Sequence, residues 1–351
     1  MNDEDYLKRC IELARNGAGL VAPNPMVGCV IVHNQTIIGE GWHKTHGGPH
    51  AEVNAINSVT NPALLAESTV YVNLEPCSHF GKTPPCADFL INHRIKKVVV
   101  GIRDPFAEVS GSGIEKLKAA GVEVIEGVLE AACKELNKRF ITFHTKKRPY
   151  IILKWAQSAD GYISPDASSM SKEAFEQKRH ITGKTVQKLV HKWRVEEDAI
   201  MVGTQTLITD NPELNTRAWP GKNPLRVVLD LNLRVPHTAK VFNKQQPSLL
   251  FTYHKNVPEH YPEHITVPEK IDVLPFILHS LFERNIQSII IEGGTYTLQK
   301  AIDAGLWDEI QIFISKKELG SGIKAPVAPA GKPFIQSNID HVQLLITTNP
   351  S

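Results

Sequence analysis

The stretch between His50 and Cys86 decides the fold and the chemistry of the first half of this chain. It reads His50-Ala51-Glu52, then Thr69-Val70-Tyr71-Val72-Asn73-Leu74, then Glu75-Pro76-Cys77, and finally Pro84-Pro85-Cys86. One imidazole and two thiolates suit a tetrahedral zinc ion whose fourth position is left for water. Glu52 closely follows the His ligand and would carry protons rather than bind the metal. The sequence therefore predicts a zinc site formed by His50, Cys77 and Cys86, with Glu52 as the catalytic residue.

The spacing of this stretch is typical of one class of zinc enzyme. A His-x-Glu pattern followed by Pro-Cys characterises the zinc deaminases of nucleobases, which have two residues between their cysteines. Here eight residues, Ser78 to Pro85, separate Cys77 from Cys86. The alternative is that both cysteines are small buried apolar residues. A Pro-Cys directly after an apolar strand, with a second Pro-Cys nearby, favours the zinc site.

Composition narrows the class of protein. The chain has 351 residues, enough for two domains with full cores. Its 39 Lys and Arg residues against 37 Asp and Glu residues argue against a protein that mainly grips nucleic acid. No apolar run approaches a membrane span, and the acidic start lacks the layout of a signal peptide. Five cysteines, two of them assigned to zinc, do not form a disulfide framework, so we expect a cytoplasmic enzyme.

Apolar periodicity predicts an α/β fold with two domains, residues 1–145 and 149–351, joined by the polar run Thr145 to Pro149. For the first half we expect a helix over 5–16, a hairpin over 26–41, a helix over 50–56, a strand over 69–74, a helix over 87–92, a strand over 97–102, a helix over 114–120, a strand over 122–125 and a helix over 131–143. This order predicts a mixed sheet covered by helices, with the metal at the strand ends.

The second half alternates strands with helices. We expect strands over 150–154, 199–202, 225–229, 248–251, 288–291, 309–314 and 341–346, and helices over 185–197 and 273–284. That alternation predicts a second α/β domain with a largely parallel sheet.

Two segments of the second half suggest an anion. Ile291 to Thr295 joins a strand to a helix through two glycines, and such a turn presents N–H groups to a negative charge. Val202 to Arg217 adds hydroxyl residues, a turn and an Arg suited to bidentate phosphate contact. The paired glycines are alternatively a plain turn. By themselves these segments predict a phosphorylated ligand in an α/β cleft.

Several motifs of the first half resemble the bifunctional deaminase–reductase family of riboflavin biosynthesis. They are Ala22-Pro23-Asn24-Pro25-Met26-Val27-Gly28, Pro49-His50-Ala51-Glu52, Leu74-Glu75-Pro76-Cys77-Ser78-His79 and Gly81-Lys82-Thr83-Pro84-Pro85-Cys86. The eight-residue gap between the cysteines is also that of the family. The resemblance implies a cytidine-deaminase-like domain with the zinc ligands and catalytic residue given above. It further implies contacts to the pyrimidine or its ribose phosphate from Asn24, His43, His79, Lys82 and Asp104.

One position of the first half departs from the family. The family usually reads Asp-Pro-Asn-Pro, whereas this chain has Asp104-Pro105-Phe106-Ala107. If that Asn helps to bind phosphate, another residue must do so here.

The resemblance extends to the second half. Lys154 to Gly161, Thr204 to Arg217 and Glu292 to Gly294 resemble the reductase half of the same family, which is similar in fold to dihydrofolate reductase and uses NADPH. The resemblance implies cofactor contacts from Ala156, His180, Thr182, Thr206, Asp210 and Gly294. It implies substrate contacts from Lys178, Arg194, Leu214, Arg217 and Glu292.

The second half departs from the family in three places. The loop after Gly161 is longer than usual, and His180-Ile181-Thr182 stands where the family has Trp-Ile-Thr. Lys178 lies near a position where a substrate-contacting Ser is common.

These observations predict a bifunctional enzyme of riboflavin biosynthesis. It would deaminate 2,5-diamino-6-ribosylamino-4(3H)-pyrimidinone 5′-phosphate by zinc-dependent hydrolysis and then reduce the ribosyl group to ribityl with NADPH. We expect Zn²⁺ and NADPH as cofactors, a small pyrimidine ribosyl phosphate as substrate, a homo-oligomer, and neither nucleic acid nor a membrane as partner.

Two other functions compete with this prediction. A nucleic-acid deaminase would need a basic groove with stacking aromatic residues, and the sequence has no such run. A deaminase fused to a reductase-like domain that only binds ligand stays open, because of the departures at Lys178 and His180.

Overall fold

The computed structural model describes residues 1–78, 84–106, 111–329 and 335–349. The chain divides into two compact units, Met1–Lys147 and Arg148–Ser351. His79 and Lys82, both predicted to contact substrate, lie outside the described residues.

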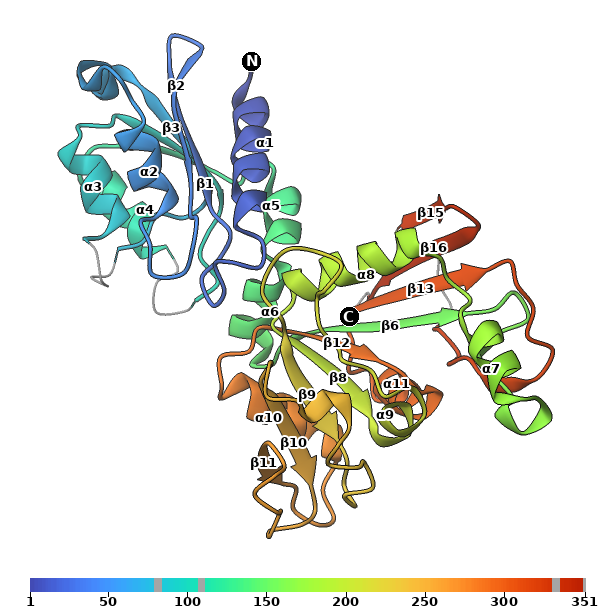
Figure 1. Ribbon diagram of the computed structural model, residues 1–351. Helices are drawn as coiled ribbons and strands as arrows, with labels where there is room; N and C mark the ends of the chain where they lie inside the picture. The colour runs from blue at the N-terminus through green and yellow to red at the C-terminus, as the bar shows by residue number, and fades with distance from the viewer. Residues whose placement is uncertain (79–83, 107–110, 330–334, 350–351) are drawn as a thin grey trace. The chain divides into compact units, whose positions relative to one another are not determined.

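The first unit is built on a five-stranded mixed sheet in the order β2-β1-β3-β4-β5 (Figure 1). The strands are β1 (Gly28–His33), β2 (Thr36–Trp42), β3 (Thr69–Leu74), β4 (Lys97–Ile102) and β5 (Glu123–Glu126). The helices are α1 (Asp3–Ala14), α2 (Ala51–Asn57), α3 (Cys86–Asn92), α4 (Ser112–Ala119), α5 (Glu130–Leu136) and α6 (Lys138–Lys146). Strand β1 runs antiparallel to β2 and β3, whereas β3, β4 and β5 are parallel.

Alternation along the strands gives this sheet two buried faces. In β3, Val70 and Val72 pack with apolar residues of α2, α3 and α4, whereas Tyr71 between them packs with those of α1 and α5. Successive side chains of a strand point to opposite faces, so a sheet covered by helices on both sides needs strands that are apolar throughout. The prediction of a mixed sheet covered by helices is confirmed.

The helix predicted over 131–143 is wrong in one respect. The structure has two helices there, α5 and α6, which meet at Asn137. Helix α6 also continues to Lys146 and so includes the first residues of the predicted linker. Apolar spacing continues across both helices, with Cys133, Leu136, Phe140 and Phe143 all buried, so periodicity alone does not reveal the break.

The second unit has a nine-stranded sheet in the order β11-β10-β9-β8-β12-β6-β13-β16-β15, and a separate pair, β14-β7. The strands are β6 (Tyr150–Gln157), β7 (Tyr162–Pro165), β8 (Ala199–Gly203), β9 (Leu225–Leu229), β10 (Ser248–Thr252), β11 (Glu263–Thr266), β12 (Ser288–Glu292), β13 (Glu309–Ser315), β14 (Gly322–Lys324), β15 (Ile335–Ile339) and β16 (Val342–Thr348). The helices are α7 (Lys172–Arg179), α8 (Lys184–Glu196), α9 (Thr204–Asp210), α10 (Val273–Phe282) and α11 (Thr295–Asp303).

The sheet of the second unit is parallel from β11 to β13, and β16 and β15 add antiparallel pairs at one edge. One face packs against α10 and α11, and the other packs against α8 and α9 (Figure 1). The prediction of a largely parallel α/β domain is confirmed. The segment after Gly161, which we expected to be a long loop, instead contains β7 and α7.

Candidate active sites

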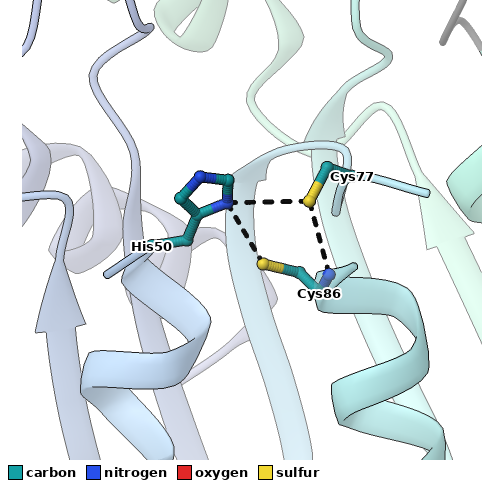
Figure 2. Close-up of side chains that lie close together, drawn as sticks. All are labelled: His50, Cys77 and Cys86. Carbon is teal, nitrogen blue, oxygen red and sulfur yellow. Dashed lines mark hydrogen bonds between the residues drawn. The ribbon is translucent and has the colours of Figure 1, made fainter. Parts of the chain in front are cut away.

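Three side chains of the first unit converge at the ends of secondary-structure elements. His50 is the residue before α2, Cys77 follows β3, and Cys86 is the first residue of α3. His50 Nδ1 lies 3.6 Å from Cys77 Sγ and 3.3 Å from Cys86 Sγ (Figure 2). A tetrahedral zinc ion with ordinary bond lengths to nitrogen and sulfur requires a separation of about 3.5 Å between such ligand atoms. The three residues therefore fit a zinc ion with one open position.

The two thiols also show that the cluster suits a cation. The thiol of Cys86 and the His50 ring, both hydrogen-bonded to Cys77, lower the pKa of Cys77 to about 4 although burial opposes this. The hydrogen bond to Cys77 and burial raise the pKa of Cys86 well above its ordinary value. A bound divalent cation would allow both sulfurs to be thiolates.

Glu52 lies in the first turn of α2 beside this cluster. Its side chain is buried, with 3% exposed, and its Oε2 has no hydrogen-bond partner among the residues that the structure describes. Burial, followed by the negative charge of Cys77, raises the pKa of its carboxyl group. A buried carboxyl oxygen without a hydrogen-bond partner costs free energy, which points to a functional reason for it. Here it lies beside the cluster of His50, Cys77 and Cys86.

Asn24 and His43 form a second wall of the same site. Asn24 Nδ2 lies 3.0 Å from His43 Nε2, and His43 Nδ1 lies 3.0 Å from the Pro49 carbonyl. Because a carbonyl only accepts, Nδ1 carries the proton and Nε2 accepts from Asn24. Burial lowers the pKa of His43, which favours this neutral state. The His43 ring lies nearly perpendicular to the His50 ring, with centroids 5.4 Å apart.

Asp104 and Phe106 follow the end of β4. The Asp104 N–H donates to Glu75 Oε2 at 3.0 Å, and its carboxylate accepts the Phe106 N–H at 2.9 Å. The Phe106 ring packs edge-on against the His144 ring, with centroids 5.1 Å apart. At this departure from the family pattern an aromatic contact takes the place of a polar amide.

The second unit holds a cleft of about 450 Å³ at the ends of its parallel strands. Most of the predicted reductase residues line it, namely Ala156, His180, Thr182, Arg194, Thr206, Asp210, Leu214, Arg217 and Glu292. Gly294 lies beside it, with its N–H donating to Thr206 Oγ1 at 2.9 Å. Lys178 is not among the lining residues of the cleft, and its Nζ instead donates to the Leu319 carbonyl at 3.0 Å.

Three charged side chains, each only 11–14% exposed, occupy the cleft wall. Arg194 Nη2 lies 2.8 Å from Glu292 Oε2, and Lys154 Nζ lies 3.7 Å from Glu292 Oε1. Burial disfavours the charged carboxylate, but Arg194 and Lys154 outweigh burial and lower the pKa of Glu292 to about 2. For Lys154 burial is the larger influence, and it lowers the pKa of the ammonium despite the nearby Glu292.

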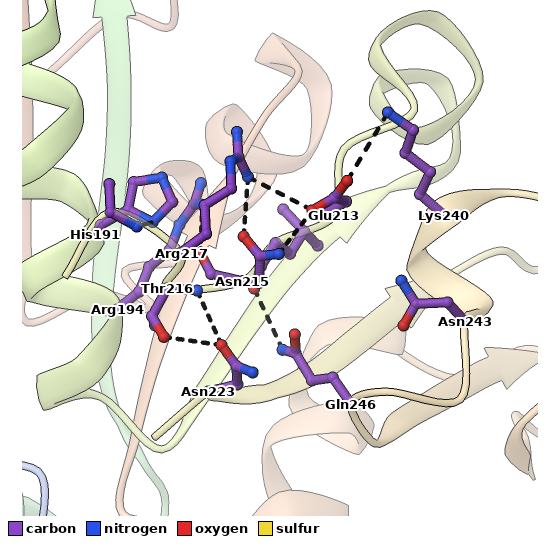
Figure 3. Close-up of polar contacts among 12 residues, drawn as sticks. His191, Arg194, Glu213, Asn215, Thr216, Arg217, Asn223, Lys240, Asn243 and Gln246 are labelled. Atoms are coloured by element: carbon purple, nitrogen blue, oxygen red, sulfur yellow. Dashed lines mark hydrogen bonds and ion pairs between the residues drawn. The ribbon is translucent and has the colours of Figure 1, made fainter. Parts of the chain in front are cut away.

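Arg217 lies on a loop that its own polar residues hold in place (Figure 3). Arg217 Nη1 donates to Asn215 Oδ1 at 2.9 Å, and Arg194 Nη1 donates to the Asn215 carbonyl at 3.2 Å. Thr216 binds the Asn223 side chain through both its N–H and its hydroxyl, at 2.9 and 2.8 Å. This arrangement brings two guanidinium groups to one end of the cleft.

The cleft residues that the sequence prediction missed include Lys154, Arg179 and His191. Arg179 Nη2 lies 2.8 Å from Asp210 Oδ1, and His191 Nδ1 accepts the Ala218 N–H at 3.4 Å. One feature of the sequence could have indicated Lys154. It lies within an apolar strand, where a lysine is rarely buried without a partner. Arg179 and His191 carry no comparable signal, since helical segments are rich in such residues.

Comparison with known proteins places both units in one class. Residues 1–102 match the cytidine and deoxycytidylate deaminase zinc-binding region, and residues 149–347 match the RibD C-terminal domain. The "Riboflavin biosynthesis protein RibD" of Aquifex aeolicus is 41% identical over 326 residues, covering 92% of this chain and 89% of the relative.

Solved structures agree over the whole length. The diaminohydroxyphosphoribosylaminopyrimidine deaminase/5-amino-6-(5-phosphoribosylamino)uracil reductase of Thermotoga maritima is 38% identical, with a TM-score of 0.86 over 99% of this chain and 98% of that one. RibD of Acinetobacter baumannii is 32% identical, with a TM-score of 0.87 over the same shares.

Fold, site and comparisons define a zinc-site deaminase domain joined to a reductase domain on one chain. The chain belongs to the RibD family of bifunctional deaminase/reductases of riboflavin biosynthesis. The alternative of a reductase-like domain that only binds ligand is not favoured, because these relatives match both halves of the chain. Within the described residues, no helix is long and apolar enough to span a membrane.

Proposed function

We propose that the first domain hydrolyses the amine from 2,5-diamino-6-ribosylamino-4(3H)-pyrimidinone 5′-phosphate and that the second domain reduces the ribosyl group of the product to ribityl with NADPH. The observation that carries this proposal is the buried Glu52 carboxyl, with one oxygen unpartnered among the described residues, beside His50, Cys77 and Cys86. The two activities named for the Thermotoga maritima protein support the choice of substrate.

Deamination requires a proton to leave water and reach the departing amine. Zinc held by His50, Cys77 and Cys86 would supply Lewis-acid activation of the attacking water. Glu52 takes one proton from that water and delivers it to the adjacent ring nitrogen as the C–O bond forms. The proton of the new hydroxyl then passes through Glu52 to the amine, so that the C–N bond breaks, ammonia leaves and a carbonyl remains. Asn24 and His43, which meet through their polar ends beside His50, hold the pyrimidine edge.

Reduction takes place in the cleft of the second domain. NADPH, when bound there, would supply the hydride to the anomeric carbon of the ribosyl group. Opening the sugar ring leaves an oxygen that needs a proton, and the buried Lys154 ammonium beside Glu292 can donate it. Arg217 and Arg194 hold the phosphate through charge-assisted hydrogen bonds. The predicted homo-oligomer stays a prediction.

The test separates the two steps on full-length, zinc-loaded protein. We expect ammonia release without NADPH, and oxidation of NADPH when the deaminated intermediate is supplied. Glu52→Gln should retain zinc but lose roughly 10²–10⁴-fold in ammonia release, because an amide cannot transfer the proton. It should oxidise NADPH with supplied intermediate at the wild-type rate.

Glu67→Gln, at an exposed position of the same domain, is the matched control and should behave as wild type in both assays. Ammonia release by Glu52→Gln near the wild-type rate would show that the proposed proton transfer is wrong. No NADPH oxidation with supplied intermediate would leave the second domain without its proposed activity.

A further inference from the structure

Asn137 stands where α5 ends and α6 begins, and its side chain is turned inward, with 2% exposed. Its Oδ1 accepts the Met26 N–H at 2.8 Å, and its Nδ2 donates to the Met26 carbonyl at 3.0 Å. One amide thus pairs with both backbone groups of a residue 111 positions away, much as a neighbouring strand would. The break between the two helices allows this contact.

A second buried amide holds the same segment from β3. Asn73 is fully buried, its Nδ2 donates to the Met26 carbonyl at 3.0 Å, and its Oδ1 accepts the Gly28 N–H at 2.7 Å. Gly28 also lies against α1, where a Cβ would be 2.1 Å from the Cys10 carbonyl oxygen. Met26 to Gly28 is therefore fixed from three directions.

The segment Met26 to Gly28 connects to Asn24 and His43, the two residues proposed to hold the pyrimidine. Asn24 lies just before it, and Pro23 and Pro25 on either side restrict the backbone between them. The His43 N–H donates to the Val27 carbonyl at 2.9 Å, so the position of the His43 backbone depends on the same segment. Displacement of Met26 to Gly28 would move Asn24 and His43 together.

We propose that Asn137 and Asn73 are positioning residues for pyrimidine recognition, which act by fixing the segment that carries Asn24 and supports His43. The inference rests on the proposed deaminase function. It makes no use of the metal ligands, and neither amide is among them. Asn137 offers the cleaner test, because it lies outside the sheet that carries the zinc ligand Cys77 at the end of β3.

The first measurement is the kinetics of ammonia release by zinc-loaded, full-length Asn137→Ala without NADPH. Both hydrogen bonds from Asn137 to Met26 are lost, so we expect KM to rise about tenfold with a smaller change in kcat. Zinc content and NADPH oxidation with supplied intermediate should equal the wild-type values. Loss of zinc together with a parallel fall in kcat would indicate a merely structural role and overturn the proposal.

A double-mutant cycle with Asn24→Ala tests the route of the effect. If Asn137 acts through Asn24, adding Asn137→Ala to Asn24→Ala should cause much less loss in kcat/KM than Asn137→Ala causes alone. Losses that multiply in the double variant would overturn the proposal. Ser68→Ala, which removes a buried hydrogen bond to the Leu64 carbonyl in the same domain, should leave KM unchanged.

If Asn137→Ala does not fold, Asn137→Ser serves the same cycle. Its shorter hydroxyl side chain cannot pair with both backbone groups of Met26, so a rise in KM is again expected. Absence of ammonia release by the wild type itself would refute the deaminase proposal. Ammonia release by the wild type, with independent effects in the cycle, would refute only the positioning role.

Discussion

Replacing Glu292 with glutamine removes the carboxylate that balances two buried cations in the reductase cleft. Glu292 is 9% exposed, Arg194 Nη2 lies 2.8 Å from it, and Lys154 Nζ lies 3.7 Å from it. Glutamine has nearly the same shape, so the cleft keeps its volume and only the charge is lost. We expect the second unit to become less stable, because Arg194 and Lys154 would remain buried without a counter-charge.

The pKa of Glu292 gives the magnitude. Arg194 and Lys154 lower it from an ordinary value of 4.5 to about 2, against the effect of burial. One pKa unit corresponds to about 1.4 kcal/mol, so this lowering corresponds to about 3 kcal/mol of stabilisation at neutral pH. Burial lowers the pKa of Lys154 even beside Glu292, so part of this stabilisation is offset. We expect Glu292→Gln to reduce the free energy of unfolding by about 3 kcal/mol at pH 7.

The dependence on pH follows from the sign of the change. A carboxyl group whose pKa is lower in the folded than in the unfolded state stabilises fully above its unfolded pKa. That stabilisation is lost as the pH falls from about 4.5 towards about 2. The difference between wild type and Glu292→Gln should therefore shrink by about 2 kcal/mol between pH 5 and pH 3.

Urea unfolding followed by tryptophan fluorescence measures this difference. Four tryptophans, Trp155, Trp193, Trp219 and Trp307, lie in the second unit, so Trp42→Phe provides a background that reports this unit. Glu283→Gln is the control, because the side chain of Glu283 is 61% exposed. A difference below 1 kcal/mol at pH 7, or one unchanged between pH 5 and pH 3, would refute the reasoning.

Two further predictions concern the metal and the cofactor. Cys77→Ser should lose zinc and ammonia release, because a neutral hydroxyl is a poor substitute for a thiolate, whereas Cys133→Ser should retain both; elemental analysis with full zinc in Cys77→Ser would rule out the ligand set. His180→Trp should tighten NADPH binding, because an indole adds apolar area to the wall of the cleft. An NADPH affinity equal to that of the wild type would exclude a contact between His180 and the cofactor.

The proximity of His50, Cys77 and Cys86 could be predicted because these residues occupy element ends that local patterns reveal. An apolar run predicts β3, so Cys77 falls shortly after the end of a strand. His50 falls where the helix before this strand begins, and Cys86 where the helix after it begins. The chemistry of imidazole, thiolate and carboxylate then limits what this set of side chains can do. The position of Asn137 could not be predicted in the same way. Helical spacing continues through it, and its partner Met26 is brought close only by the tertiary fold.

The ion pairs of the reductase cleft could not be predicted from the sequence, because their partners lie on different elements. Lys154 on β6 and Arg194 on α8 meet Glu292 at the end of β12, and no local pattern predicts that one carboxylate serves both cations. Lys178 and His180 both depart from the family pattern, and only the structure shows which of the two faces the cleft. Lys178 binds the Leu319 carbonyl and does not line the cleft, whereas His180, two positions later, does line it. A sequence change near a binding site therefore affects binding only when the fold directs the changed side chain towards the ligand. Here the position of Lys178 on α7 directs its side chain to the Leu319 carbonyl and not into the cleft.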